Sequence, residues 1–209
     1  MDLVRGNRGW VEVIVGPTFS GKSEELIRRL RRAEIARQLV QVFRCEGDGR
    51  QSSNQIVSHS GLHICSIGVS TAAAIFQKVQ ARTEVIGIDE AQFLDEEVVE
   101  VCARLASLGK RVVVAGLDTD CFGRPFACVQ QLLSTAEEIT KLLAICARCG
   151  NPAVHTQKMD EREGPAIISA PGVYEARCRR CFEPALGSVR ENSVRPLPIS
   201  GRIASAGGA

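Results

Sequence analysis

One octapeptide constrains this chain more than any other feature. Gly16-Pro17-Thr18-Phe19-Ser20-Gly21-Lys22-Ser23 fits the pattern G-x-x-x-x-G-K-[ST] and directly follows the apolar run Val11 to Val15. In such a loop the backbone N–H groups surround a polyphosphate, the lysine reaches the β- and γ-phosphates, and the final hydroxyl ligates Mg²⁺. A chance match in a loop rich in glycine and serine is the alternative. The apolar strand before the motif and the helical run after it favour a nucleoside triphosphate site.

Short runs rich in β-branched residues alternate with helical stretches along much of the chain. Strands are expected at Trp10 to Val15, Val40 to Arg44, Val85 to Ile88 and Val112 to Leu117, and helices at Glu24 to Gln38, Thr71 to Ala81 and Asp95 to Leu108. Alternation of this kind predicts a mainly parallel sheet flanked by helices. Together with the phosphate loop, it indicates an α/β fold of the P-loop NTPase-like class.

A pair of acids ends one of these strands. In Val85-Ile86-Gly87-Ile88-Asp89-Glu90 the apolar run stops at two adjacent carboxylates. In P-loop proteins an acid at such a strand end holds Mg²⁺, directly or through water, and Asp89 fits that task. Glu90, one residue further on, is then available as a general base for an acceptor hydroxyl. Two acids of a surface loop are the alternative, which the preceding phosphate loop disfavours.

Two C-x-x-C pairs, Cys146-Ala147-Arg148-Cys149 and Cys178-Arg179-Arg180-Cys181, lie in the C-terminal third. Four thiolates from two turns match a tetrahedral Zn²⁺ site that leaves no open position for catalysis, so structural zinc is predicted. A redox dithiol and cysteines that merely fill a core are the alternatives. We expect a phosphate-loop domain at residues 1–143 and a small zinc-ribbon-like domain at 144–186. Residues 187–209, rich in small and polar residues, are expected to be a disordered tail.

Composition and charge argue against several classes of protein. No apolar run approaches the roughly 20 residues that span a membrane, and the N-terminus lacks the apolar stretch of a secretory signal. A cytoplasmic protein without a membrane partner is therefore expected. A net charge of +2 gives no reason to expect a nucleic-acid partner. The first expected helix carries four arginines, Arg28, Arg29, Arg31 and Arg32. We interpret them as a solvated face, with nucleic-acid contact as the alternative.

Taken in order, these motifs resemble the type II thymidine kinases, a cytosolic, zinc-containing family. The resemblance runs from about Val11 to Phe182. The family's phosphate loop reads G-P-M-F-S/A-G-K-S/T, and its acidic strand end reads I-D-E-x-Q-F, which Ile88 to Phe93 matches. Further matches are Asp48-Gly49-Arg50 before Ser58-His59, Gly116-Leu117-Asp118 before Pro125-Phe126, and Tyr174 before Cys178. The resemblance implies ATP-dependent phosphorylation of the 5′-hydroxyl of thymidine.

The resemblance also implies functions for individual residues. It assigns Lys22 and Ser23 to ATP and Mg²⁺, Asp89 to the metal, Glu90 to deprotonation of the 5′-hydroxyl, and Arg50 to the phosphates. The thymine pocket would be lined by Phe93, Leu117, Cys121, Phe126, Thr156 and Tyr174, and backbone groups of Ile167, Ile168 and Ser169 would read the edge of the base. A loop between the cysteine pairs would close over the nucleoside as a lid. The family further implies a homotetramer that thymidine triphosphate inhibits.

Two positions depart from the family pattern. Thr18 stands where methionine is usual, and Cys121 with Phe122 stands where phenylalanine and arginine are usual. Thr18 and Cys121 are smaller than the residues they replace, so we expect a roomier, less apolar pocket that binds thymidine more weakly. A nucleotide-binding relative with altered nucleoside specificity or lost turnover is therefore an alternative to thymidine kinase activity. A nucleic-acid-stimulated P-loop ATPase is a third interpretation.

Overall fold

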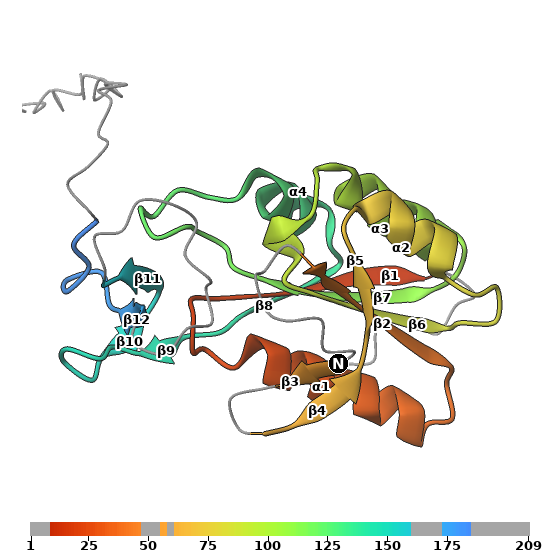
Figure 1. The fold of residues 1–209 in the computed structure, drawn as a ribbon, viewed down its shortest axis with the longest axis horizontal. Helices are drawn as coiled ribbons and strands as arrows, with labels where there is room; N and C mark the ends of the chain where they lie inside the picture. The colour runs from red at the N-terminus through yellow and green to blue at the C-terminus, as the bar shows by residue number, and fades with distance from the viewer. Residues whose placement is uncertain (1–8, 47–54, 58–60, 160–172, 185–209) are drawn as a thin grey trace, which may run out of the picture.

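A parallel sheet of six strands forms the centre of the protein (Figure 1). The structure is a computed structural model that describes residues 9–46, 55–57, 61–159 and 173–184. In spatial order the strands are β5 (Ile67–Val69), β2 (Val40–Cys45), β6 (Val85–Asp89), β7 (Arg111–Gly116), β1 (Trp10–Val15) and β8 (Glu138–Lys141). Neighbouring strands pair in parallel throughout this sheet. This arrangement confirms the predicted α/β, P-loop NTPase-like class.

The register of the sheet brings three strand ends to one edge. Val15, the last residue of β1, lies opposite Gly116, the last residue of β7, and Asp89 ends β6 opposite Arg44 of β2. β1, β6 and β7 are buried along almost their whole length, because apolar residues dominate them and other elements cover both faces. The segments that follow these three strands therefore start at the edge where parallel α/β sheets bind their ligands.

The two faces of the sheet are covered differently (Figure 1). One face carries α2 (Ala72–Lys78), α3 (Glu97–Ser107), α4 (Ala127–Thr135) and a short 3₁₀ helix, η2 (Ala91–Phe93). The other carries α1 (Lys22–Ile35) and an antiparallel hairpin of β3 (Gln55–Val57) and β4 (His63–Cys65). Strand alternation lets β1 serve both layers, since Val13 belongs to one apolar cluster and Ile14 to the other. Among the described residues, no helix combines the length and hydropathy needed to cross a membrane.

A buried ion-pair network fastens α1 to the sheet. Arg29 of α1 donates hydrogen bonds to Glu12 of β1 (2.6 Å) and to Glu138 of β8 (2.9 Å). Arg111 of β7 donates to the same Glu12 carboxylate (2.6 Å). Burial alone raises the pKa of Glu12, but Arg111, Arg29 and the Trp10 indole together lower it below the ordinary value. The network therefore ties three strands to one helix through a carboxylate that stays charged.

The arginines of α1 do not share one environment. Arg28 and Arg32 are exposed, as the sequence indicated, but Arg29 is only 9% exposed. The predicted solvated face is therefore wrong at Arg29. Its charge can be buried because carboxylates from two strands meet it and the Thr140 hydroxyl accepts a further bond (2.7 Å). Helical periodicity does not reveal partners that lie on other strands.

The strands and helices expected from the sequence are present, with ends that differ by up to three residues. α1 begins at Lys22, inside the phosphate motif, and ends at Ile35 rather than Gln38. The structure adds β5, α4 and β8 to the sheet and its cover, and the sequence pattern did not indicate them. Both strands are short. The residues of β8 are half-buried or exposed, so the conformation of β8 depends on its pairing with β1 rather than on an apolar pattern.

The chain after Leu142 forms a small unit that we call the cysteine module (residues 144–159 and 173–184). It contains two antiparallel pairs, β9 (Ala144–Ile145) with β10 (Pro152–Ala153), and β11 (His155–Lys158) with β12 (Tyr174–Arg177). Its buried cluster consists of small residues only: Ala144, Cys146, Ala153, Ala176, Cys178 and Cys181. A core of this size needs a further source of stability.

Candidate active site

The phosphate motif forms the connection between β1 and α1. Gly16 directly follows β1, and a Cβ at this position would lie 2.4 Å from the carbonyl oxygen of Leu142, which is too close for any side chain. Phe19 (φ 65°) and Gly21 (φ 85°) are left-handed and turn the chain toward the start of the helix. The loop therefore brings its backbone to the N-terminus of α1, where unpaired N–H groups and the macrodipole favour an anion.

Lys22 and Ser23, the last two residues of the motif, begin α1. Lys22 Nζ donates to the carbonyl oxygen of Pro17 (2.9 Å), so its side chain folds back across the loop. Ser23 Oγ donates to Asp89 Oδ2 (3.0 Å), which joins the loop to the end of β6. Ser20 Oγ is buried and has no hydrogen-bond partner in the described part of the chain. This hydroxyl fits a site that completes its hydrogen bonds with a bound phosphate.

Asp89 and Glu90 are both buried at the end of β6. Burial raises the pKa of Asp89 to about 7, and the charge of Glu90 adds to the rise. The Ser23 hydroxyl, the Glu90 backbone N–H and the Lys22 charge oppose the rise without cancelling it. A buried carboxylate with so little compensation favours a bound cation, and its oxygen together with the Ser23 hydroxyl suits Mg²⁺, which prefers oxygen ligands.

Glu90 is held in an uncommon conformation. Its backbone is left-handed (φ 56°, ψ 40°), which is rare for a residue with a side chain. Glu90 Oε2 accepts a hydrogen bond from Gln92 Nε2 (2.6 Å), and Gln92 Oε1 accepts one from the backbone N–H of Leu117 (3.0 Å). Strained backbone fixed by surrounding contacts is typical of functional residues. The sequence indicated Gln92 only as part of a motif, because its link to Glu90 and Leu117 depends on β6 and β7 being neighbours.

The residues expected to line a nucleoside pocket come from several segments. Thr18 of the phosphate loop and Thr156 of β11 meet directly, since Thr156 Oγ1 accepts a hydrogen bond from the Thr18 N–H (3.0 Å) and the two hydroxyls are 3.3 Å apart. Leu117 is buried directly after β7. Phe93 and Phe126 are partly buried against the larger apolar cluster. The structure thus brings the phosphate loop and the cysteine module into contact at two of the predicted positions.

The loop after β7 lies beside the cysteine module. Asp120 Oδ1 accepts hydrogen bonds from the N–H groups of Phe122 and Arg124 (both 2.8 Å), which folds the loop into a tight turn. A Cβ on Gly123 would lie 3.4 Å from the Phe182 ring. The remaining predicted pocket residues are placed as follows: Cys121 is half-buried in this loop, Tyr174 is buried opposite Lys158, and Arg50, Ile167, Ile168 and Ser169 lie outside the described residues.

The four paired cysteines converge on one point. The Sγ atoms of Cys146, Cys149, Cys178 and Cys181 all lie within 4.8 Å of one another, and those of Cys149 and Cys178 are 3.6 Å apart. A tetrahedral ion with Zn–S bonds of about 2.3 Å requires sulfur separations of about 3.8 Å, so the four thiols fit Zn²⁺. The Asn151 backbone N–H, then contacts with the Cys181 and Cys178 sulfurs, lower the pKa of Cys149 and favour its thiolate.

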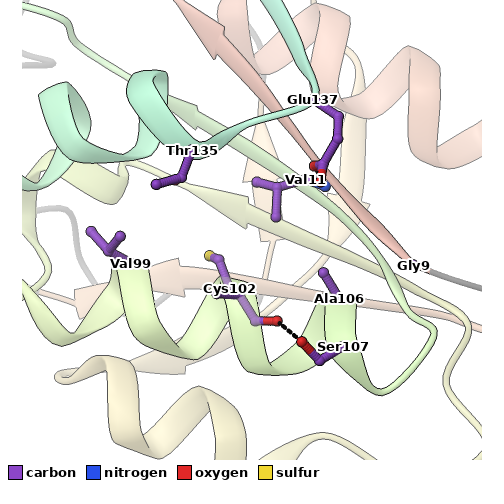
Figure 2. A pocket seen from close by; sticks show the side chains of 9 residues that line it. Gly9, Val11, Val99, Cys102, Ala106, Ser107, Thr135 and Glu137 are labelled. Atoms are coloured by element: carbon purple, nitrogen blue, oxygen red, sulfur yellow. Dashed lines mark hydrogen bonds between the residues drawn. The ribbon is translucent and has the colours of Figure 1, made fainter.

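A separate cavity of about 450 Å³ lies near the start of β1, between α3 and the end of α4 (Figure 2). Two of its polar side chains are already engaged, because Ser107 donates to the carbonyl oxygen of Ala103 (2.9 Å) and Glu137 accepts from the Val11 N–H (2.7 Å). None of the predicted site residues lines this cavity. The phosphate loop and the acid pair therefore lie away from this cavity, at the carboxyl ends of the strands.

The sequence matches known proteins over most of its length. A family model described as thymidine kinase matches residues 9–182. A thymidine kinase from Rhodothermus sp. (strain ITI 518) is 49% identical over 195 residues, which cover 93% of this chain and 91% of that protein. Among solved structures, the flagellar accessory protein FlaH from Methanocaldococcus jannaschii aligns at 13% identity and a TM-score of 0.49, over 73% of this chain and 83% of that one. The family match spans both the phosphate loop and the paired cysteines, and this chain belongs to the thymidine kinase family.

Proposed function

We propose that Glu90 is the general base of the thymidine kinase reaction, in which ATP phosphorylates the 5′-hydroxyl of thymidine. The observation that carries this assignment is the Ser23–Asp89 hydrogen bond, which joins the phosphate loop to the acid pair. Glu90 directly follows Asp89, and its strained, hydrogen-bonded conformation supports a residue held for chemistry. The base therefore belongs to the same strand end as the phosphate-binding machinery.

The ATP phosphates are assigned to the backbone of residues 16–23 and to Lys22. Ser23 and Asp89 would hold Mg²⁺, which neutralises charge on the β- and γ-phosphates when it is bound. The unpaired Ser20 hydroxyl and the poorly compensated Asp89 carboxylate support these assignments. Arg50, which lies outside the described residues, is assigned to the phosphate region from the family resemblance alone.

The reaction needs one proton transfer and one phosphoryl transfer. As the 5′-oxygen forms its bond to the γ-phosphorus, the bond between that phosphorus and the bridging oxygen breaks and ADP leaves. Glu90 takes the proton that the 5′-hydroxyl loses. A positioned general base contributes a factor of roughly 10² to 10⁴ to such a step.

Thymine is proposed to bind between the phosphate loop, the loop after β7 and the cysteine module. The Thr18–Thr156 contact supports this placement, because it joins the first of these segments to the third. The apolar walls that a flat, neutral base needs are assigned to Phe93, Leu117, Phe126 and Tyr174, with Cys121 beside them and backbone groups of Ile167, Ile168 and Ser169 at the base edge. Because Thr18 and Cys121 are small, we expect tolerance of bulkier pyrimidines.

Zinc is proposed to be structural. Four thiolates complete a tetrahedral shell and leave no open position, and the small core of the cysteine module supports a need for the metal. On this proposal residues 144–186 form a zinc-binding domain with a lid loop, residues 1–143 a kinase domain and residues 187–209 a tail. A homotetramer and a cytoplasmic location are carried over from the family resemblance.

Phosphoryl transfer by Glu90→Gln tests the assigned base. Purified protein with ATP–Mg²⁺ and a panel of deoxynucleosides should show thymidine as a substrate, and the variant should lose a factor of about 10² to 10⁴ in kcat with little change in ATP binding. Glu97→Gln, an exposed substitution on α3, is the control and should keep the activity. A Glu90→Gln enzyme with unchanged kcat would place the base elsewhere.

A further inference from the structure

Gln92 links two parts of the active site with one carboxamide. Its Nε2 donates to Glu90 Oε2 (2.6 Å), and its Oε1 accepts from the Leu117 N–H (3.0 Å). The residue is only 6% exposed, so both ends of the amide bond to protein groups in place of water. Leu117 directly follows β7 and Glu90 directly follows β6, so the amide joins the segments after two neighbouring strands, at their carboxyl ends.

The backbone at Gly116 leaves space for this amide. A Cβ on Gly116 would lie 2.9 Å from Gln92 Oε1, closer than side chains normally approach. The glycine therefore allows the carboxamide to reach the Leu117 N–H while its other end meets Glu90. The link between Glu90 and Leu117 thus depends on the close approach of the Gln92 amide to Gly116.

We propose that Gln92 is a positioning residue that fixes the Glu90 carboxylate relative to the segment after β7. The proposal rests on the assignment of Glu90 as the base. Glu90 has a left-handed backbone and a flexible side chain, so a charge-assisted hydrogen bond to one of its oxygens restricts where the carboxylate lies. A reacting group misplaced by about 1 Å can cost roughly 100-fold in rate, so this restriction is expected to affect kcat.

Three substitutions disturb the amide in different ways. Gln92→Glu keeps an oxygen for the Leu117 N–H but replaces the amide donor to Glu90 with a second carboxyl group, which repels the Glu90 charge or shares a proton with it. Gln92→Met removes both hydrogen bonds with a side chain of similar length. Gly116→Ala leaves Gln92 in place chemically but displaces its amide. All three are expected to lower kcat for thymidine by roughly 10- to 100-fold, with the KM for ATP changed little.

Gln157→Met is the matched control. Gln157 is also buried, and both ends of its amide are hydrogen-bonded to backbone. Its Nε2 donates to the carbonyl oxygens of Glu183 (2.7 Å) and Lys158 (3.2 Å), and its Oε1 accepts from the Glu183 N–H (2.8 Å). Loss of buried amide hydrogen bonds destabilises a protein in either place. The control should therefore lower the melting temperature as the Gln92 variants do, without the fall in kcat.

A double-mutant cycle with Glu90→Gln decides the proposal. If Gln92 acts through Glu90, Gln92→Met lowers kcat in the parent enzyme but has no further effect once Glu90 is replaced. An equal loss in both backgrounds, or no loss in the parent, overturns the positioning function and leaves the base assignment standing. If Glu90→Gln itself leaves kcat unchanged, the base assignment fails and this proposal fails with it. Thermal unfolding of each variant confirms that folded enzymes are compared.

Discussion

Two buried carboxylates on the same sheet meet opposite surroundings. Glu12, near the start of β1, accepts hydrogen bonds from Arg29 and Arg111, and its pKa lies below the ordinary value. Asp89, at the end of β6, accepts from a hydroxyl and a backbone N–H, and its pKa is raised to about 7. Burial acts against both charges, so the difference comes from the partners.

On the proposed function, the difference separates an acid that stabilises the fold, Glu12, from one that is kept for a bound cation, Asp89. Removing one partner of a compensated buried pair leaves a charge without a partner and is strongly destabilising. A carboxylate that lacks a full counter-charge makes the folded protein less stable, and it is retained where a cation completes it. In this protein the first kind lies toward the amino ends of the strands and the second at their carboxyl ends.

The four paired cysteines of the cysteine module are a further group of acids that a cation would complete. Their substitution is expected to have the largest effect on activity. Cys149→Ser or Cys178→Ser should lose bound zinc, unfold the module and abolish thymidine phosphorylation, because the module's core is small. Metal content per chain, limited proteolysis and activity would be measured together. Cys65→Ser, at an exposed cysteine outside the pairs, is the control. A folded module in metal-free protein would contradict a structural zinc.

Asp89→Asn should separate activity from stability. We expect kcat to fall at least 100-fold, because a metal ligand contributes several kcal/mol to the transition state. The pKa of Asp89 rises from 3.8 to about 7 on folding, so its contribution to stability is lost as pH rises through about 7. The variant should therefore melt at least about 2 °C higher than the parent at pH 8, and the gap should close toward pH 4. A lower melting temperature at pH 8 would show that the carboxylate is compensated.

Glu12→Gln should lower stability and leave activity unchanged, the reverse of Asp89→Asn. Breaking this buried network at pH 7 should lower the free energy of unfolding by about 3 kcal/mol, while the folded fraction keeps its kcat. The pKa of Glu12 is lowered on folding, so its stabilisation is present above about 4.5 and is lost as pH falls through the folded value. Urea unfolding at pH 7 and pH 3 should show the deficit shrinking in acid. Glu34→Gln, at an exposed position on α1, is the control. An equal loss of unfolding free energy in the control would show that burial and pairing of Glu12 do not account for its effect.

Thr18→Met, at a buried pair without charge, should have the smallest effect. The Thr18 N–H can still donate to Thr156, so stability should change little. Greater apolar area beside the base should lower the thymidine KM about four-fold, which corresponds to about 0.8 kcal/mol for one methylene. Adding Cys121→Phe should give a non-additive change if both residues contact the same base. An unaltered KM in the double variant would show that neither residue borders thymine.

The sequence predicts what is encoded locally. The octapeptide, the acid pair and the C-x-x-C pairs are contiguous, and the parallel sheet follows from alternating strands and helices. The contacts that the sequence could not indicate join distant residues: Arg29 to Glu12 across 17 positions, Leu117 to Gln92 across 25, and Thr18 to Thr156 across 138. Those pairs depend on which strands and loops become neighbours, and no periodicity within a segment specifies that. Buried polar partners were therefore missed even where their elements were predicted.

The position of β1 between β7 and β8 has a consequence for synthesis of the chain. β1 leaves the ribosome first, but the strands beside it begin only at Arg111 and Glu138. At a translation rate of about 5–20 residues per second, β1 and the loop after it wait roughly 5–20 s for the first of these neighbours. A nascent chain that ends before Arg111 carries the whole octapeptide without the strands that flank β1 in the sheet. Incorporation of β1 into the sheet therefore depends on strands that are distant in the sequence and synthesised later, which makes this step of folding slow.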